Sequence, residues 1–413
     1  MTIHHSPFAR AVARLAVPLI LVAAAHAAGP SLREIYDAHR WFELRQAVRT
    51  QRAPVFYRGA VACAFAQDNT AERLLTRAIH DSPRSWEAGE ARSLLIFLYV
   101  RQGRHHAALG VIDEALKFDP KSDPQDFRSM VAGLARAPDL SIERRAYSRV
   151  QGKIEDENLF VPLTINDKTV HWILDTGMNF SGVVSESEAK ALGLTVVHAN
   201  MQGMDANGGQ QMMNVATLPT LEMGNIRLHN VGLTVIPDSA PPMNLLPAGE
   251  RGILGLPTIM QLGTLSWTRD GTVEAGFRTK RRGEPNLCLD GLNPLTPVVV
   301  EGRSLDFLFD TGNGGGTQLW RKFGEAFPDL LRDKGSKDTK TVRQIGGATE
   351  REVIALPELH LVLGGFDTLL KPARVFGKPV GNDSYYGLAG MDLMMQARRV
   401  TIDFSAMRVE LKN

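Results

Sequence analysis

The chain has 413 residues, enough for two or three domains that each bury a hydrophobic core. Its 47 lysine and arginine residues nearly balance 45 aspartate and glutamate residues, and the formal net charge of +2 gives no reason to expect nucleic acid or an anionic membrane as a partner. A hydrophobic content of 44% with 7% aromatic residues is typical of a soluble globular protein and excludes a disordered or fibrous chain.

The first 27 residues predict a secretory signal peptide. Arg10 and Arg14 precede an apolar run over residues 15–25, and Ala25-His26-Ala27 supplies the small residues of a cleavage site. The run is short for a bilayer span, and no second run of this kind follows. We therefore expect an exported protein, periplasmic or secreted, without a stable membrane anchor. The alternative is that this run anchors the chain in a membrane.

Residues 28–123 predict a domain of α-helices, because long proline-free stretches carry apolar residues at intervals of three and four. Four positions recur after a constant interval of 37 residues: Ala71, Leu75, Ala78 and Pro83 return as Ala108, Ile112, Ala115 and Pro120. This pattern resembles tetratricopeptide repeats, which would offer a binding surface to a peptide or protein partner. The alternative is a helical cap that only packs against the rest of the chain.

The sequence pattern changes after residue 123. Residues 124–154 are mixed and charged, and we interpret them as a connection that contains a helix. From residue 155 onward, β-branched and aromatic residues alternate with polar ones between glycine-containing turns, which predicts short strands and few helices. Two β-rich lobes are expected, over residues 155–280 and 281–413.

An internal repeat supports this division into lobes. Asp175-Thr176-Gly177 ends one apolar run, and Asp310-Thr311-Gly312 ends another run 135 positions later. The same shift relates residues 252–261, GILGLPTIMQ, to residues 387–396, GLAGMDLMMQ. The sequence therefore predicts two copies of one β-rich lobe, packed about a pseudo-twofold axis.

Such an axis would bring the carboxyl groups of Asp175 and Asp310 together. Two carboxyl groups within hydrogen-bonding distance share a proton and titrate as a coupled pair. The charged member can then deprotonate a water molecule while the protonated member polarises a substrate carbonyl, which is what amide hydrolysis requires. The glycine of each turn would let the backbone pass close to the carboxylates, and the two threonine hydroxyls could hydrogen-bond across the axis.

These turns and the later apolar-apolar-glycine segments resemble the retropepsin-like aspartic proteases, the clan that includes pepsin, over about residues 155–413. The resemblance implies an all-β, bilobal fold behind the helical repeats, and so a multidomain α + β protein. It implies an aspartic endopeptidase with Asp175 and Asp310 as catalytic residues, a peptide or protein substrate, and no cofactor. Because one chain carries both lobes, it also implies a monomeric protease unit.

The resemblance also assigns supporting residues. Those beside the catalytic pair are Thr176, Gly177, Thr311, Gly312 and Asn313. Two further glycines, Gly255 and Gly390, would pass beside the catalytic turns as structural residues. Flap hairpins are assigned to the glycine-containing turns at residues 202–211 and 343–352, where the substrate-contacting positions would be Gly203, Gly208, Gly209, Gly346 and Gly347.

The position after each catalytic-turn glycine departs from the family pattern. Family members place a small residue or a hydroxyl there, beside the outer oxygen of the acid, whereas this chain has Met178 and Asn313. The Asn313 side chain can donate a hydrogen bond and the Met178 side chain cannot, so the two acids should have unequal environments. The alternative function is therefore a catalytically impaired peptide-binding protein or scaffold on the same fold.

The sequence gives little support for a metal site, because it contains neither an H-E-x-x-H segment nor paired C-x-x-C motifs. The adjacent His105 and His106 lie in a helical stretch, where neighbouring side chains point apart, and we interpret both as solvated. No residue is therefore assigned as a metal ligand.

Overall fold

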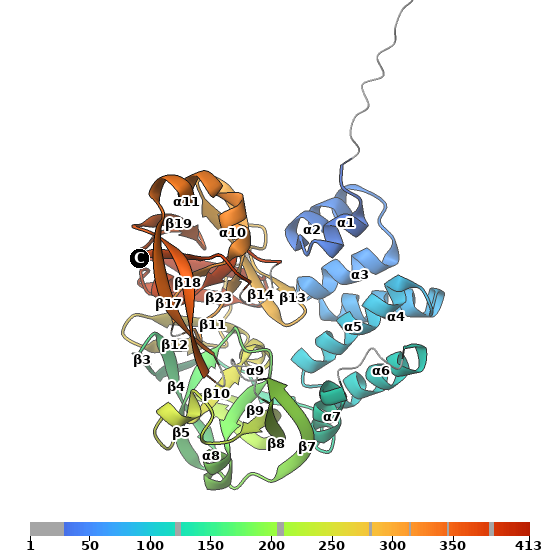
Figure 1. Ribbon diagram of the computed structural model, residues 1–413. Coiled ribbons are helices and arrows are strands. Elements are labelled where there is room, and N and C mark those ends of the chain that lie inside the picture. The colour runs from blue at the N-terminus through green and yellow to red at the C-terminus, as the bar shows by residue number, and fades with distance from the viewer. Residues whose placement is uncertain are drawn as a thin grey trace, which may run out of the picture.

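The computed structural model describes residues 29–119, 125–204, 210–280, 283–313, 315–344, 347–379 and 384–413. Figure 1 shows a helical part beside a larger β-rich part, whose lower portion comes from the middle of the chain and whose upper portion comes from its C-terminal third. The prediction of an N-terminal helical region followed by a largely β region is confirmed. The predicted signal peptide lies outside the described residues.

The helical part is built from seven helices within the described residues. They are α1 (Leu32–Asp37), α2 (Trp41–Thr50), α3 (Val55–Ala64), α4 (Asp68–Asp81), α5 (Trp86–Arg101), α6 (His105–Phe118) and α7 (Gln125–Leu134). A capping box starts α1, because the Ser31 hydroxyl accepts from the Glu34 N–H and the Glu34 carboxylate accepts from the Ser31 N–H. The last helix, α7, lies in the segment expected to connect the helical and β-rich parts.

Small residues let these helices approach one another closely. A Cβ atom on Gly59 of α3 would lie 2.9 Å from Leu75 Cδ2 of α4, so a larger residue would push the two helices apart. The repeat positions that are buried in the core are Ala71, Leu75, Ala78, Ala108 and Ile112. The recurring sequence pattern therefore marks contacts between helices.

A nine-stranded sheet forms the lower β-rich portion. Its strands are β1 (Ser141–Arg144), β3 (Lys153–Glu155), β4 (Asn158–Ile165), β5 (Lys168–Asp175), β6 (Gly182–Ser185), β7 (Val196–Met204), β8 (Gln210–Met223), β9 (Ile226–Ile236) and β10 (Gly252–Gly255). Short helices α8 (Glu186–Ala191), η1 (Met243–Leu245) and α9 (Leu256–Gln261) follow three of these strands. An additional pairing of β8 with β9 curls the sheet toward a barrel.

A ten-stranded sheet forms the upper portion. Its strands are β13 (Cys288–Asp290), β14 (Asn293–Val300), β15 (Arg303–Phe309), β16 (Gln318–Leu319), β17 (Ser336–Gln344), β18 (Gly347–Leu356), β19 (Leu359–Leu363), β20 (Phe366–Leu370), β21 (Ala373–Phe376) and β22 (Gly387–Ala389). Its helices are α10 (Arg321–Ala326), α11 (Pro328–Lys334) and α12 (Met391–Met394).

A third sheet of five strands joins the two portions. It contains β2 (Ser148–Gln151), β11 (Thr264–Thr268), β12 (Thr272–Ala275), β23 (Arg399–Asp403) and β24 (Arg408–Lys412). Strand β11 follows the nine-stranded sheet and β23 follows the ten-stranded sheet, and the two pair antiparallel from Thr264 opposite Asp403 to Thr268 opposite Arg399. Backbone hydrogen bonds between β11 and β23 therefore join the two portions.

Both large sheets present an Asp-Thr-Gly turn in the same local setting. In the nine-stranded sheet β5 runs parallel to β10, with Asp175 opposite Gly255. In the ten-stranded sheet β15 runs parallel to β22, with Phe309 opposite Ala389. Strands β4 and β14, which precede them, bury the same positions along their length. Each turn thus follows a strand whose exposed start gives way to a more buried end.

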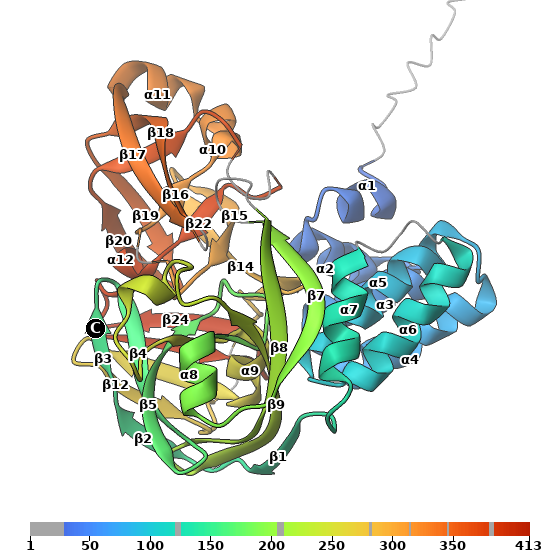
Figure 2. The same ribbon diagram turned by 60° about the horizontal axis from the view of Figure 1, so that its bottom comes forward.

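The helical part packs against both large sheets (Figure 2). On one side, a Cβ atom on Gly133 of α7 would lie 2.7 Å from Val215 Cγ2 of β8. On the other, His39 Nδ1 lies 2.8 Å from Asp290 Oδ2 at the end of β13. Among the described residues, no helix is both long and apolar enough to cross a membrane.

The interpretation of His105 as solvated is wrong. His105 is the first residue of α6, and its side chain faces β9, where a Cβ atom on Gly232 would lie 3.1 Å from His105 Cε1. Only 3% of the residue is exposed. Burial among apolar side chains lowers the pKa of His105 to about 4. Its neighbour His106 is exposed, and its Nδ1 lies 2.9 Å from Asp139 Oδ1.

Candidate active site

The two sequence-predicted aspartates meet between the large sheets. Asp175 ends β5 and Asp310 directly follows β15, and their carboxyl groups are hydrogen-bonded to each other. Each glycine of the turns packs on the opposite carboxyl group, because a Cβ atom on Gly177 would collide with Asp310 Cγ and one on Gly312 would collide with Asp175 Cγ. Only glycine at these positions allows the two carboxyl groups to approach.

The two threonines lock the turns together through reciprocal hydrogen bonds. The Thr176 N–H donates to Thr311 Oγ1 at 3.0 Å, and the Thr311 N–H donates to Thr176 Oγ1 at 3.1 Å. Each hydroxyl then donates to a carbonyl across the pair, Thr176 to Phe309 O and Thr311 to Leu174 O, both at 2.7 Å. Both threonine residues are 1% exposed, so these four bonds form away from water.

Replacing Thr311 with valine should destabilise the fold by about 3 kcal/mol, because a buried N–H and a buried carbonyl would lose their partners. The valine methyl groups would occupy nearly the same volume, so the loss would come from hydrogen bonding. Chemical unfolding of Thr311→Val beside Thr169→Val, at an exposed position on β5, measures the difference. Equal stability of the two variants would show that the reciprocal bonds contribute nothing.

Backbone N–H groups hold each carboxyl group in place. The Gly177 N–H donates to Asp175 Oδ1 at 2.8 Å, and the Gly312 N–H donates to Asp310 Oδ1 at 2.9 Å. The next N–H along the chain, that of Met178 or Asn313, lowers the pKa of the carboxyl group of its own turn, and the Met178 N–H also donates to the Asp175 main-chain carbonyl at 3.4 Å. The residue after each glycine therefore supports the acid through its backbone, whatever its side chain.

Burial raises the pKa of both aspartates. For Asp175 the loss of hydration is the largest cause, and the neighbouring Asp310 carboxylate raises the pKa further, well above its usual range. For Asp310 burial again raises the pKa, while N–H donors and the hydrogen bond from Asp175 oppose that rise. The pair therefore holds one proton over a pH range that extends above that of isolated carboxyl groups.

The Met178 and Asn313 side chains both point away from the carboxyl groups. Met178 is 5% exposed and packs among Phe160, Ile173, Val183 and other apolar residues. The Asn313 Nδ2 donates to Gly316 O at 2.6 Å, so the side-chain donor expected for Asp310 is used within its own loop. The unequal support expected from these side chains is therefore absent, because neither one reaches an acid.

The two apolar-apolar-glycine strands lie beside the turns but are fixed differently. The Gly255 N–H donates to the Ser181 carbonyl at 3.1 Å, and the Gly390 N–H donates to Thr317 Oγ1 at 3.0 Å. Thr317 in turn donates through its hydroxyl to Asp392 Oδ1 at 2.6 Å. No sequence motif predicts the roles of Thr317 and Asp392, although Asp392 lies within the repeated segment that contains Gly390.

The two segments predicted as flaps are hairpins. Strands β7 and β8 pair with Met204 opposite Gln210, and β17 and β18 pair with Gln344 opposite Gly347. Gly203 therefore lies in β7 and Gly347 starts β18. The other predicted flap glycines, Gly208, Gly209 and Gly346, lie outside the described residues.

A polar group near the second hairpin was also missed by the sequence analysis. Burial lowers the pKa of Lys340 on β17, while burial and the Asp392 carboxylate raise the pKa of Glu157, between β3 and β4. A Cβ atom on Gly316 would lie 3.1 Å from Asp392 Oδ2 and 3.6 Å from Glu157 Oε2. No sequence signal connects these residues, because they come together only in the folded chain.

Within the described ranges, no three histidine, cysteine, aspartate or glutamate side chains cluster as metal ligands would.

Residues 161–258 match the family model described as aspartyl protease. The matched segment contains the Asp175 turn and Gly255, and this match supports a protease-like function for the β-rich part. No curated protein matches the chain.

Two solved structures are similar to part of the chain. A retropepsin-like aspartic protease from Rickettsia conorii is 15% identical, with the alignment covering 31% of this chain and 98% of that one at a TM-score of 0.25. The retroviral protease-like domain of Ddi1 from Leishmania major is 16% identical, with 25% of this chain and 75% of that one covered at a TM-score of 0.16.

Proposed function

We propose that the protein is an aspartic endopeptidase in which Asp175 and Asp310 activate the hydrolytic water. One observation carries the proposal: two Asp-Thr-Gly turns are locked by reciprocal threonine bonds so that their carboxyl groups share a hydrogen bond. A structural turn needs one aspartate at most. Two buried carboxyl groups facing each other cost stability, which is understandable where a shared proton is used in chemistry.

The catalytic dyad, Asp175 and Asp310, can carry out the full hydrolysis without another reactive group. The charged carboxylate removes a proton from water as the water oxygen attacks the peptide carbonyl carbon, while the protonated carboxyl group donates to the carbonyl oxygen. The C–N bond of the tetrahedral gem-diol then breaks as the proton held by the pair moves to the leaving amine nitrogen, and a gem-diol hydroxyl returns a proton to the pair as the carboxylic acid forms. The pair again holds one proton when the two peptide products leave, so the site returns to its starting state.

We further propose that the two β-rich portions are tandem lobes related by a pseudo-twofold axis. Support comes from the matching settings of β5 and β15 and from the threonine bonds, which join residues 135 positions apart. One chain would then supply both catalytic aspartates, so the protease unit needs no second copy and no cofactor. The division into residues 155–280 and 281–413 follows from this interpretation.

The helical part and the N-terminal segment also have proposed roles. The helices of residues 28–123 are proposed as tetratricopeptide-like repeats that bind a substrate or protein partner, and residues 1–27 as a signal peptide for export to the periplasm or the medium. Neither nucleic acid nor a stable membrane anchor is proposed as part of this function.

The test is cleavage of an unbiased peptide mixture by the chain lacking residues 1–27, followed by mass spectrometry from about pH 3 to pH 8, the range over which coupled carboxyl groups titrate. A double variant, Asp175→Asn with Asp310→Asn, should produce no new termini. Asp367→Asn, at an exposed position on β20, is the matched control and should cleave like the parent. Identical product peptides from the parent and the double variant would refute the proposal.

One observation favours a second function, a peptide-binding protein without turnover. Both side chains that follow the catalytic-turn glycines are turned away from the acids, so the outer carboxyl oxygens lack a side-chain donor from these positions. If this loss were decisive, the folded parent would bind peptides from the mixture and return them uncleaved at every pH.

A further inference from the structure

A groove with a volume of about 450 Å³ lies where the helical part meets both large sheets. The helical wall includes Leu94 and Phe97 of α5 and Phe127 and Met130 of α7. The opposite wall includes Phe180, from the segment after β5, and Leu292, from the turn between β13 and β14. Three separate parts of the fold therefore build one groove.

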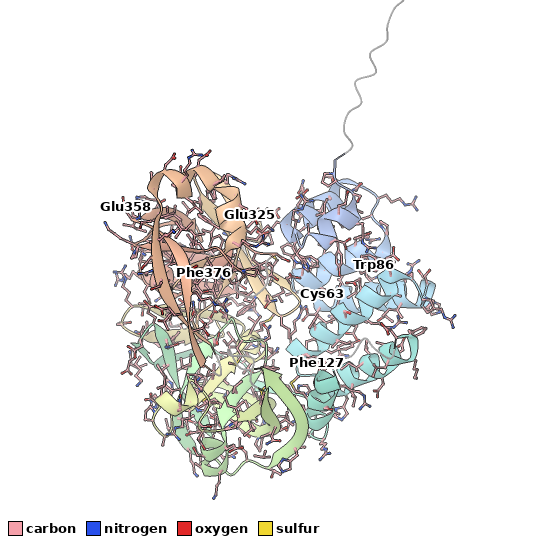
Figure 3. All side chains as sticks on the ribbon, in the orientation of Figure 1. Cys63, Trp86, Phe127, Glu325, Glu358 and Phe376 are labelled. Carbon is pink, nitrogen blue, oxygen red and sulfur yellow. The ribbon has the colours of Figure 1, made fainter. Side chains whose placement is uncertain are left out.

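The groove has an apolar surface that the protein core leaves partly uncovered. Phe97, Phe127 and Phe180 are each half-buried and come from three different elements. Figure 3 labels Phe127 at the edge of the helical part that faces the β-rich part. Aromatic rings gathered at the wall of an open groove are the usual anchor points for a bound chain.

The groove adjoins the chain segment that follows the first catalytic turn. Phe180 and the exposed Asn179 line the groove, and they follow Met178, whose N–H donates to the main-chain carbonyl of Asp175 at 3.4 Å. Helix α7 connects the groove to the first flap hairpin as well, because Gly133 of the same helix packs on Val215 of β8. A polypeptide that leaves the dyad along residues 178–180 would therefore meet α5 and α7.

The charge of the groove restricts its occupant. Its lining contains the carboxylates of Glu90 and Asp290 and no lysine or arginine. His39 Nδ1 lies 2.8 Å from Asp290 Oδ2, and this contact raises the pKa of His39, so the imidazole offsets the charge of that carboxylate when it is protonated. Glu90 has a neutral donor instead, because it accepts from the Tyr36 hydroxyl at 2.9 Å. Acidic segments should therefore be disfavoured there.

We propose that this groove is an extended subsite that binds the substrate polypeptide beyond the residues flanking the scissile bond. The occupant is an extended, non-acidic segment that places an aromatic or long aliphatic side chain against Phe97, Phe127 and Phe180. This inference rests on the proposed endopeptidase function and gives the helical part a specific task within it. The helices select substrates by binding them at a distance from the dyad.

The test uses fluorogenic peptides of about 12 residues, which at about 3.3 Å per residue extend past the dyad on both sides. Each peptide has at its centre a sequence that the parent cleaves in the mixture assay, with polar residues on both sides. One phenylalanine then replaces each of these polar residues in turn. The parent should cleave the peptide with phenylalanine at one distant position about tenfold faster, in kcat/KM, than its serine counterpart, as expected for one aromatic anchor.

Two variants should remove this preference. Phe127→Ala deletes one wall of the groove, and Ser93→Trp fills the groove from an exposed position on α5 without removing any packing. The measurement is the ratio of kcat/KM for the phenylalanine peptide to that for its serine counterpart, which should fall in both variants. Phe118→Ala is the matched control, because Phe118 is a 44% exposed phenylalanine of the helical part that is not among the residues lining the groove.

The outcomes separate the subsite from the catalytic proposal. If the parent cleaves peptides but no distant position shows a preference, or if Ser93→Trp retains it, the subsite is refuted and the endopeptidase stands. If the parent cleaves nothing, the endopeptidase is refuted, and fluorescence anisotropy with a labelled, non-acidic peptide of about 12 residues that carries one phenylalanine among polar residues decides on the groove: weaker binding to Phe127→Ala supports it, and equal binding refutes it. A changed oligomeric state in these variants, with cleavage unaltered, would show that the groove binds a second copy instead.

Discussion

Replacing Asp310 with asparagine is expected to lower kcat/KM for a cleaved peptide by about a thousandfold or more, with little change in peptide affinity. Asparagine keeps the shape of the side chain and can still accept from the Gly312 N–H, which donates to Asp310 Oδ1 at 2.9 Å. It cannot take a proton from water, so attack on the peptide carbonyl loses its base. Initial rates and peptide binding by anisotropy, measured on the same preparation, separate turnover from affinity.

The same substitution should make the protein more stable at pH 7. Burial raises the pKa of Asp310, so the folded state binds a proton more tightly than the unfolded state does. Stability contributed by the protonated form is present below about pH 4 and is lost as the pH rises through the raised pKa of the dyad. A neutral asparagine avoids that loss. A variant that is both inactive and less stable than the parent would point to misfolding, and would leave the assigned role of Asp310 without support.

The raised pKa values of the two aspartates also predict the pH range of the proposed activity. Activity requires one proton on the pair, and this state persists until the pH exceeds the higher of the two coupled values. Because burial raises the pKa of both aspartates, the falling side of the pH profile should lie above that of ordinary carboxyl groups. Rates measured across the pH range should therefore still be appreciable at a mildly acidic pH.

The centre of the site could be predicted from the sequence because it depends on local chemistry. An apolar run that ends in Asp-Thr-Gly specifies a buried strand followed by a tight turn, and the second copy supplies the partner. The predicted threonine bonds and the close glycine contacts are both present. These features need only that two similar strands end face to face.

The surroundings of the site depend on packing that no local pattern encodes. Asn313 was expected to offer a donor near Asp310, but its loop turns back and Gly316 O takes that donor. Thr317 and Asp392 are 75 positions apart and form a pair only because β16 lies beside β22. The groove likewise needs helices and strands from three regions of the chain, so its aromatic residues are indistinguishable from core residues in the sequence.

His105 shows how packing also sets the pH range of the folded protein. Helical periodicity places it on α6 but does not reveal that β9 covers it, with Gly232 close to its ring. Its neutral form fits this apolar contact, whereas protonation would bury a positive charge. The Asp139 carboxylate favours protonation and His106 opposes it, but burial is the largest cause and lowers the pKa of His105 to about 4.

The expected result is a loss of about 3 kcal/mol of stability between about pH 6.5 and pH 4 from this one residue. The unfolded histidine takes up a proton near pH 6.5 and the folded one near 4, so stability is complete above pH 6.5 and falls as the pH decreases. His105→Leu should remove most of this dependence, whereas His80→Leu, at a side chain 88% exposed, should leave it unchanged. Unfolding free energies at several pH values test this, and parallel curves for the parent and His105→Leu would contradict it.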